Sequence, residues 1–277
     1  MSAAPVAPIA PVKLSVQGLD KEFPGRRRSP AVQALAGVDL EVRSGELVCI
    51  VGSSGCGKST LLSIIGGLES PTRGEVEVAG ERVIGPGPDR AMVFQTYSLY
   101  PWKTVAQNIR FGLECAGTAR NERQERVAEL LGIMGLTTFA DHLPHQLSGG
   151  MRQRVAIARA LAPEPDVLLL DEPFGALDAQ TKRAMQEFLL LVWKRTQATI
   201  LMVTHDVEEA IYLSQRIYVL SSRPGRVHSV IEVPFGSSRS PATKRDPRFL
   251  DLRDEIEDLL ISPAAEPAVA GPAERRS

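Results

Sequence analysis

A glycine-rich loop between two apolar segments constrains the fold of this chain more than any other feature. Residues 52–60 read Gly-Ser-Ser-Gly-Cys-Gly-Lys-Ser-Thr, which fits the pattern G-x-x-x-x-G-K-S/T. The continuous apolar run 47–51 predicts a strand buried on both faces, and the pattern over 58–66 predicts a helix directly after the loop. In this setting, successive backbone N–H groups and the helix N-terminus face a bound anion. The sequence therefore predicts a nucleoside triphosphate site.

Two side chains of this loop have separate predicted roles. Lys58 supplies a mobile cation for the β- and γ-phosphates, and Ser59 supplies a hydroxyl ligand for Mg²⁺. Cys56 also lies in the loop, so we expect its alkylation to block ATP binding; the alternative is a small residue that merely fits. The predicted nucleotide contacts of the loop are Gly52, Ser53, Ser54, Gly55, Cys56, Gly57, Lys58, Ser59 and Thr60.

Two carboxylates follow a second apolar run. Residues 167–170 (Val-Leu-Leu-Leu) predict another buried strand, which Asp171 and Glu172 follow directly. At the end of such a strand, Asp171 can hold Mg²⁺ directly or through water. Glu172 can polarise an attacking water as a general base. Together with the phosphate loop, this pair predicts hydrolysis of the nucleotide.

A third motif, Leu-Ser-Gly-Gly-Met-Arg-Gln, begins at residue 147. Ser148 stands where a helix N-cap is expected, and Gly149 and Gly150 open the helix. This arrangement is either a plain capped helix or a second helix start that meets a γ-phosphate. The chain already has one phosphate loop, so a second phosphate-facing helix is useful where it reaches the nucleotide of another copy. The motif therefore predicts a dimer.

The pattern along the chain indicates an α/β domain with a helical lobe inserted near residues 96–162. We predict arms without regular structure at 1–11 and 262–277, because both are rich in Ala and Pro. The predicted strands cover residues 13–17, 38–42, 47–51, 75–78, 82–83, 91–94, 166–170, 199–203, 216–220 and 227–233. The predicted helices cover residues 58–66, 105–113, 121–132, 150–161, 179–195, 207–213 and 248–260.

Composition excludes several classes of protein. The formal net charge is −1, so a basic surface for nucleic acid is not expected. No apolar stretch approaches 18 residues, and the first residues lack the features of a signal peptide. The three cysteines lack metal-site spacing, which fits a reducing cytosol.

The motifs and their order resemble those of the ATP-binding cassette (ABC) ATPases from about residue 14 to 260. The resemblance implies a P-loop NTPase (RecA-like) core with an antiparallel β subdomain and an inserted α-helical subdomain, here a single cassette over residues 12–261. It implies that ATP and Mg²⁺ are bound and that two copies pair head to tail. Ser148, Gly149 and Gly150 then complete the site of the partner, and the loop 174–178 crosses the interface.

The resemblance also gives roles to three further residues. Gln95, in Met-Val-Phe-Gln, matches the glutamine that couples the γ-phosphate and Mg²⁺ to the helical lobe. His205, in Val-Thr-His-Asp, matches the switch histidine that contacts the γ-phosphate. Phe23 stands where the family places an aromatic ring that stacks on adenine. Glu172, His205 and Gln95 are thus the predicted catalytic residues, with Ser59, Gln95 and Asp171 at the metal.

Several segments are similar to those of the importer group that handles nitrate, aliphatic sulfonates and taurine. They are residues 85–90, 101–102, 171–178, 222–226 and 249–260. This resemblance implies an ATPase on the cytoplasmic face of the inner membrane, bound to transmembrane permease subunits and served indirectly by a periplasmic binding protein. The aromatic segment after Gln95 would contact the permease, through Tyr97, Leu99, Tyr100 and Trp102. An exporter ATPase and a non-transport ATPase acting on nucleic acid are the alternatives; the latter is disfavoured because the chain has no coiled-coil or zinc insertion.

Overall fold

The computed structural model describes residues 10–25, 30–236 and 239–261. The predicted arms fall outside these ranges except for residues 10 and 11. The strands are β1 (Val12–Phe23), β2 (Val32–Arg43), β3 (Leu47–Gly52), β4 (Arg73–Val78), β5 (Glu81–Arg82), β6 (Arg90–Val93), β7 (Val167–Asp171), β8 (Ile200–Thr204), β9 (Arg216–Leu220) and β10 (Val227–Glu232). The helices are α1 (Lys58–Ile65), α2 (Val105–Cys115), α3 (Arg120–Ile133), α4 (Gly149–Leu161), α5 (Ala179–Thr196), α6 (Val207–Leu213) and α7 (Pro247–Ile261), and three short 3₁₀ segments complete the set.

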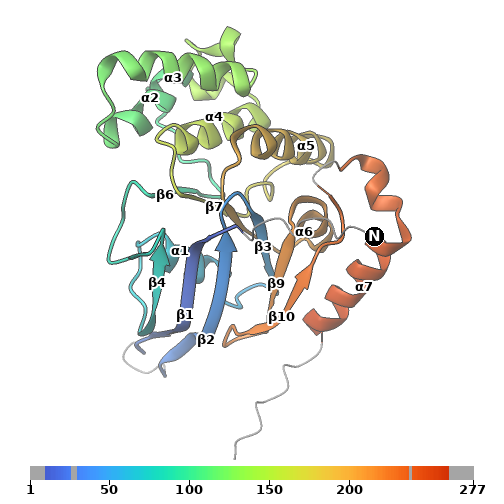
Figure 1. Ribbon diagram of the computed structural model, residues 1–277. Helices are drawn as coiled ribbons and strands as arrows, with labels where there is room; N and C mark the ends of the chain where they lie inside the picture. Colours follow the sequence, from blue (N-terminus) through green and yellow to red (C-terminus); the bar gives the residue numbers. More distant parts are fainter. Residues whose placement is uncertain (1–9, 26–29, 237–238, 262–277) are drawn as a thin grey trace, which may run out of the picture.

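Two sheets form the body of the molecule, and a helical lobe stands at one end (Figure 1). The larger sheet has the order β10-β9-β3-β8-β7-β6, with only β10 antiparallel to its neighbour. The smaller, antiparallel sheet has the order β2-β1-β4-β5. The carboxyl ends of β3, β7 and β8 meet at one edge, which is where ligands bind in open parallel sheets. The predicted fold class is confirmed.

The central strand β3 divides its side chains between two hydrophobic cores. Leu47, Cys49 and Val51 belong to the core under α5, α6 and α7. Val48 and Ile50 belong to the second core, which α1 and the antiparallel sheet cover. Since alternate residues of a strand point to opposite faces, burial on both faces requires an uninterrupted apolar sequence. The structure therefore confirms the prediction that residues 47–51 form a strand buried on both faces.

The first two strands are longer than the sequence predicted. Gly18 and Gly37 have φ of +54° and +58°, and the pairing of β1 with β2 shifts register around them. Their N–H groups donate to Asp39 and Asp20, respectively, each at 2.7 Å. These irregularities interrupt the alternation of apolar and polar residues. The alternation therefore predicts only the short strands 13–17 and 38–42. The added length brings Phe23, at the end of β1, to the phosphate loop.

The helical lobe consists of α2, α3 and α4, near its predicted position (Figure 1). Thr104 and Gln107 form a capping box at the start of α2. The buried Asn108 amide donates to the carbonyls of Tyr100, Lys103 and Thr104, which fixes the aromatic segment before the helix. Within the described ranges, no helix has both the length and the apolar character needed to cross a membrane.

Candidate nucleotide-binding site

The phosphate loop holds its lysine in a defined position. Lys58 is buried, and its Nζ donates to the carbonyl oxygens of Gly52 at 2.7 Å and Ser53 at 3.1 Å. Gly57 has φ of +107°, and a Cβ there would lie 2.7 Å from a methyl group of Leu35. Only glycine fits this position, because the backbone is left-handed and β2 approaches closely. The glycine geometry and these two hydrogen bonds therefore shape the loop around the ammonium group.

Cys56 is buried inside the same loop. Its side chain is 1% exposed, and a Cβ on Gly52 would lie only 2.6 Å from its Sγ. The thiol therefore fills the inside of the loop, as the alternative interpretation had it. Alkylation that blocks ATP binding stays a prediction, and it requires the loop to open first.

Ser59 and Asp171 lie together at the predicted metal position. The Ser59 hydroxyl donates to Asp171 Oδ1 at 3.1 Å, which joins the start of α1 to the end of β7. Burial raises the pKa of Asp171, the nearby Glu172 acts in the same direction, and the Ser59 hydrogen bond opposes both. A hydroxyl and a carboxylate fit Mg²⁺, which usually takes few protein ligands and completes its shell with phosphates and water. No cluster of three or more His, Cys, Asp or Glu residues that could hold a metal occurs among the described side chains.

Glu172 has an unusual backbone conformation and a direct contact with His205. Its φ is +43°, a left-handed value that costs energy in a residue other than glycine. Its N–H donates to Val203 O at 3.0 Å, and its Oε2 lies 3.1 Å from His205 Nδ1. The two predicted catalytic side chains are therefore adjacent, at the ends of neighbouring strands β7 and β8.

Gln95 reaches the same place from the end of β6. A Cβ built on Gly175 would lie 3.3 Å from Gln95 Nε2 and 3.7 Å from Glu172 Oε2. The amide of Gln95 and the carboxylate of Glu172 thus flank one glycine. Gln95 is exposed, and the helical lobe follows it in the chain, so its position fits the predicted link between site and lobe.

A hollow of about 240 Å³ lies over the phosphate loop and is lined in part by Phe23. The Phe23 ring is 37% exposed, and Lys21 Nζ lies 4.8 Å from its centre. The predicted adenine contact therefore borders the predicted phosphate contacts. Arg223, which the sequence did not assign to the site, also lines this hollow, and its Nε donates to Gly55 O at 3.2 Å. The sequence connects residues 222–226 only with the importer group.

The Ser-Gly-Gly motif is built as a helix start that faces outwards. Ser148 is exposed, and its Oγ accepts from Met151 N at 3.3 Å, so it is the N-cap of α4. A Cβ on Gly150 would lie 3.0 Å from a methyl group of Thr181, so this glycine permits close packing on α5. Ser148, Gly149 and Gly150 are not among the described residues that line the hollow over the loop. A single chain thus does not bring the two predicted phosphate contacts together.

A polar network behind His205 was not predicted from the sequence. The buried Glu209 accepts from Thr204 Oγ1 at 2.5 Å and from Gln186 Nε2 at 3.1 Å. Lys182 Nζ lies 2.7 Å from Asp206 and 3.5 Å from Glu209. Burial raises the pKa of Glu209, and the hydrogen bond from Thr204 opposes this effect. Since Thr204 and Asp206 flank His205, the network fixes the backbone on both sides of that residue.

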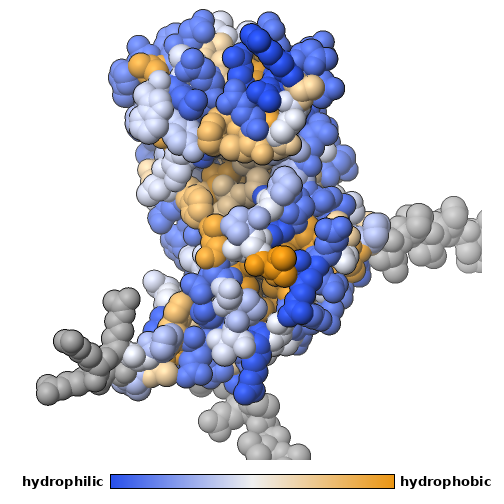
Figure 2. Space-filling view, turned by 90° about the vertical axis from the view of Figure 1, so that its left-hand side faces the viewer, coloured by the Kyte–Doolittle hydropathy of each residue, from blue (hydrophilic) through white to orange (hydrophobic). Residues whose placement is uncertain are grey.

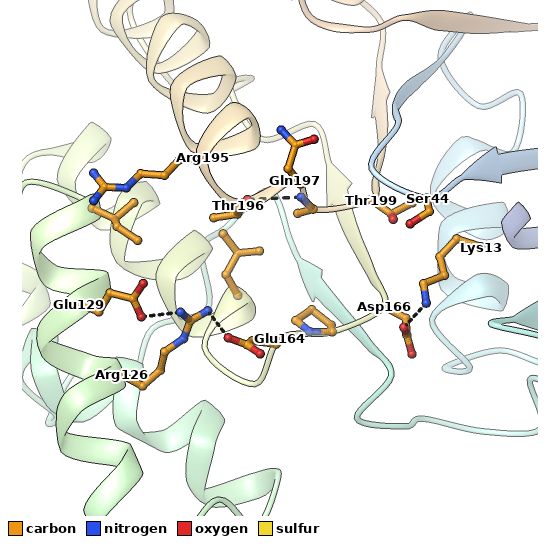
Figure 3. A pocket seen from close by; sticks show the side chains of 14 residues that line it. Lys13, Ser44, Arg126, Glu129, Glu164, Asp166, Arg195, Thr196, Gln197 and Thr199 are labelled. Atoms are coloured by element: carbon orange, nitrogen blue, oxygen red, sulfur yellow. Dashed lines mark hydrogen bonds and ion pairs between the residues drawn. The ribbon is translucent and has the colours of Figure 1, made fainter. Parts of the chain in front are cut away.

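A second hollow, of about 490 Å³, lies away from these motifs (Figure 3). Five of its charged side chains pair with each other: Lys13 with Asp166 at 2.6 Å, and Arg126 with Glu129 at 2.6 Å and Glu164 at 3.1 Å. It contains none of the predicted site residues. We therefore assign the nucleotide to the phosphate loop, although the hollow there is smaller.

Comparison of the sequence with known proteins shows the family of this chain. Residues 35–175 match the ABC transporter family. The nitrate import ATP-binding protein NrtD of Synechocystis sp. is 51% identical over 89% of this chain and 94% of its own length. The chain belongs to the ABC transporter family. The taurine import ATP-binding protein TauB of Roseobacter denitrificans is 45% identical over 83% of the chain and 87% of its own length.

Solved structures of ABC ATPases share the fold. The dimeric post-hydrolysis state of the cassette MJ0796, bound to ADP and Pi, aligns with a TM-score of 0.68 and 33% identity over 80% of this chain and all of that one. The structure of cbiO1 from Clostridium perfringens aligns with a TM-score of 0.71 and 26% identity over 86% of this chain and 92% of that one. The predicted family, fold and ATP-hydrolysing class are thereby confirmed, whereas the roles of individual residues stay predictions.

Proposed function

We propose that this ABC ATPase powers a binding-protein-dependent importer of nitrate, aliphatic sulfonate, taurine or a related small anion. The observation that carries the proposal is its similarity, over nearly the whole chain, to ATP-binding subunits of nitrate and taurine import. The phosphate loop, Asp171, Glu172 and His205 also meet at one sheet edge, as nucleotide hydrolysis requires. The solute would be selected by a permease and a periplasmic binding protein, and the ATPase would work at the cytoplasmic face of the membrane.

The proposed catalytic unit is a head-to-tail dimer. Each nucleotide binds between the phosphate loop of one chain and the exposed Ser148 helix start of the other. The dimeric state of the ADP-bound relative supports this arrangement, and so does the separation of the two motifs within one chain. Lys58 turns from the carbonyl oxygens of Gly52 and Ser53 to the phosphates. Neither chain then has a complete site alone.

Hydrolysis follows from the adjacent side chains at the ends of β7 and β8. Water attacks the γ-phosphorus, the bond to the ADP oxygen breaks, and Glu172 accepts the proton from the water. His205 contacts the γ-phosphate while remaining next to Glu172. Mg²⁺, when bound, neutralises charge on the β- and γ-phosphates, and Ser59, Asp171 and Gln95 would hold it.

The proposed permease contact is a groove of about 500 Å³ between the helical lobe and the larger sheet. Apolar side chains gather on this face of the molecule, in a hollow below the lobe (Figure 2). Met92, Phe111 and Arg159 line the groove. Tyr100 packs against Phe111 with ring centres 4.7 Å apart, and Trp102 next to it is 71% exposed. An exposed aromatic residue beside an apolar groove suits a protein partner.

The four predicted permease contacts differ in their surroundings. Tyr100 packs on Phe111, which lines the groove, and Trp102 packs on Tyr100. Tyr97 and Leu99 are instead partly buried against the main core. Arg159 also donates to the carbonyl oxygens of Ser98 and Tyr97, at 2.7 and 3.2 Å. We therefore propose Trp102 and Tyr100 as the permease contacts, with the other two supporting the loop.

Reconstitution tests the proposal. The chain is co-purified with a candidate permease and a candidate binding protein from the same genome and placed in vesicles with ATP on the ATPase side. We expect ATP-dependent movement of nitrate or taurine towards that side, and none with Lys58→Ala. ATP-dependent movement in the opposite direction would indicate an exporter. Failure to bind any permease, together with ATPase activity stimulated by DNA or RNA, would contradict the transport function.

A further inference from the structure

Gln153 lies inside the protein between the Ser148 helix start and the segment that carries Glu172. Its side chain is fully buried, and its Nε2 donates to the carbonyl oxygen of Pro173 at 2.6 Å. Its Oε1 is also buried and has no hydrogen-bond partner in the described part of the chain. The residue therefore leaves one polar atom unsatisfied, at an energetic cost, while making a single short hydrogen bond.

This hydrogen bond acts on the residue directly after Glu172. With φ at +43°, Glu172 keeps its conformation only because neighbouring groups hold it. Its N–H is bound to Val203 O at 3.0 Å, and its carbonyl oxygen accepts from Gly175 N at 3.1 Å. The Gln153 amide holds the next carbonyl, that of Pro173. The backbone at Glu172 and Pro173 is thus held by three hydrogen bonds, of which only one comes from the helical lobe, while His205 contacts the Glu172 side chain itself.

The same helix carries Ser148. Gln153 follows it by five residues, which turns the side chain by about 140° around the helix axis. One side of the first turns of α4 is therefore free to meet a partner, while the other rests on the segment after Glu172. The two glycines allow the start of α4 to approach this segment closely, because Cβ atoms on Gly149 and Gly150 would lie 3.2 Å from Leu177 and 3.0 Å from Thr181.

We infer that Gln153 is a positioning residue for Glu172 of its own chain. Through it, the helix that binds the nucleotide of the partner is linked to the general base of its own site. This inference rests on the proposed dimeric function, since it assigns two sides of the first turns of one helix to two different active sites. Gln153 itself contacts neither nucleotide nor water in the reaction.

A mixed dimer separates this role from a purely structural one. One chain carries Glu172→Gln and is supplied in excess, so the only hydrolysing site uses the phosphate loop and Glu172 of the other chain. Gln153→Met keeps the volume of the side chain but removes the donor. It is placed either in the hydrolysing chain (the cis pairing) or in the Glu172→Gln chain (the trans pairing). The trans pairing is the matched control, because the same substitution then affects only the chain that supplies Ser148.

We expect the cis pairing to lower kcat about tenfold, with KM for ATP within about twofold, because the base is displaced while the nucleotide contacts remain. The trans pairing should stay within about twofold of the reference dimer in both constants. Gln153→Glu, of the same size, should also lower kcat in cis and serves as the second variant.

Other outcomes overturn the inference. The inference fails if kcat is unchanged in the cis pairing or if kcat falls only in the trans pairing. It also fails if kcat falls equally in both pairings, which includes the case of a Gln153 variant that does not fold. If the reference dimer without any Gln153 substitution does not hydrolyse ATP, the proposed dimeric function fails instead. The two failures are therefore distinguishable.

Discussion

His205 Nδ1 lies 3.1 Å from Glu172 Oε2, across the ends of two neighbouring parallel strands. The pairing of Asp171 with Val203 sets this distance. Glu172 comes one residue after Asp171, and His205 comes two residues after Val203. As the Nδ1-protonated tautomer, the imidazole donates to the carboxylate and orients it. The base is therefore oriented from two directions, by His205 through its side chain and by Gln153 through the backbone.

Glu172→Gln should separate ATP binding from hydrolysis. The amide keeps the size of the side chain but cannot accept a proton, so hydrolysis should fall by a factor of about 10² to 10⁴. ATP binding and ATP-dependent dimer formation should remain, because the phosphate contacts are unchanged. Phosphate release and size-exclusion chromatography with ATP measure the two effects. Turnover near the wild-type rate would remove Glu172 from the role of base.

Lys58→Ala should reduce nucleotide affinity. The ammonium group lies inside the loop, 2.7 Å from Gly52 O, where a phosphate oxygen can replace the carbonyl contact. Removing this charge should raise the Kd for ATP at least about tenfold, in line with a lost charge-assisted hydrogen bond. Isothermal titration with ATP measures the change. Lys103→Ala, at a half-buried lysine outside the loop, is the control and should leave the Kd unaltered.

Ser148→Asp should block dimer formation without weakening the chain itself. Aspartate is a good N-cap and its charge suits a helix N-terminus, so the free energy of unfolding should change by less than about 0.5 kcal/mol. In a dimer the same carboxylate would face the γ-phosphate of the partner site. ATP-dependent dimers of a Glu172→Gln background should therefore disappear, as light scattering would detect. Ser148→Ala, in contrast, should cost about 1 kcal/mol of stability.

The phosphate loop and the strands of the larger sheet could be predicted because local sequence determines them. The run 47–51 is buried on both faces and needs no partner for its interpretation, and the glycines of the loop mark positions where no side chain fits. The predicted motif residues meet in the structure for the same reason: they follow parallel strands whose carboxyl ends share one edge. Asp171, Glu172 and His205 are the clearest case.

The remaining features depend on contacts between distant segments. Gln153 reads as an ordinary polar residue of a helix, and only the packing of α4 on residues 173–181 shows it buried. Glu209 likewise lies in the charged first turn of a short helix, which suggests an exposed side chain. It is nevertheless buried, and it accepts hydrogen bonds from Thr204 and Gln186. The lengths of β1 and β2 were underestimated because Gly18 and Gly37 interrupt the alternation. Local patterns carry no signal for such tertiary contacts.

The ion pair beside His205 gives the chain a predictable pH dependence. Burial raises the pKa of Asp206, but hydrogen bonds from Lys182 and from Glu209 N–H outweigh it, so the pKa lies below its ordinary value. A carboxyl group with a lowered pKa in the folded state stabilises the fold above its unfolded pKa of about 3.9, and this contribution is lost as pH falls through the folded pKa.

Asp206→Asn keeps the N-cap of α6 but removes the charge that faces Lys182. Because the two side chains are 24% and 34% exposed, we expect a loss of about 0.5–1 kcal/mol in the free energy of unfolding at pH 7. The difference from wild type should shrink below about pH 4, as Asp206 itself becomes protonated. Urea unfolding at pH 7 and at the lowest pH where the chain stays folded measures it, with Asp141→Asn, at an exposed carboxylate, as the control. A difference that grew on acidification would mean that Lys182 does not stabilise the Asp206 carboxylate in the folded state.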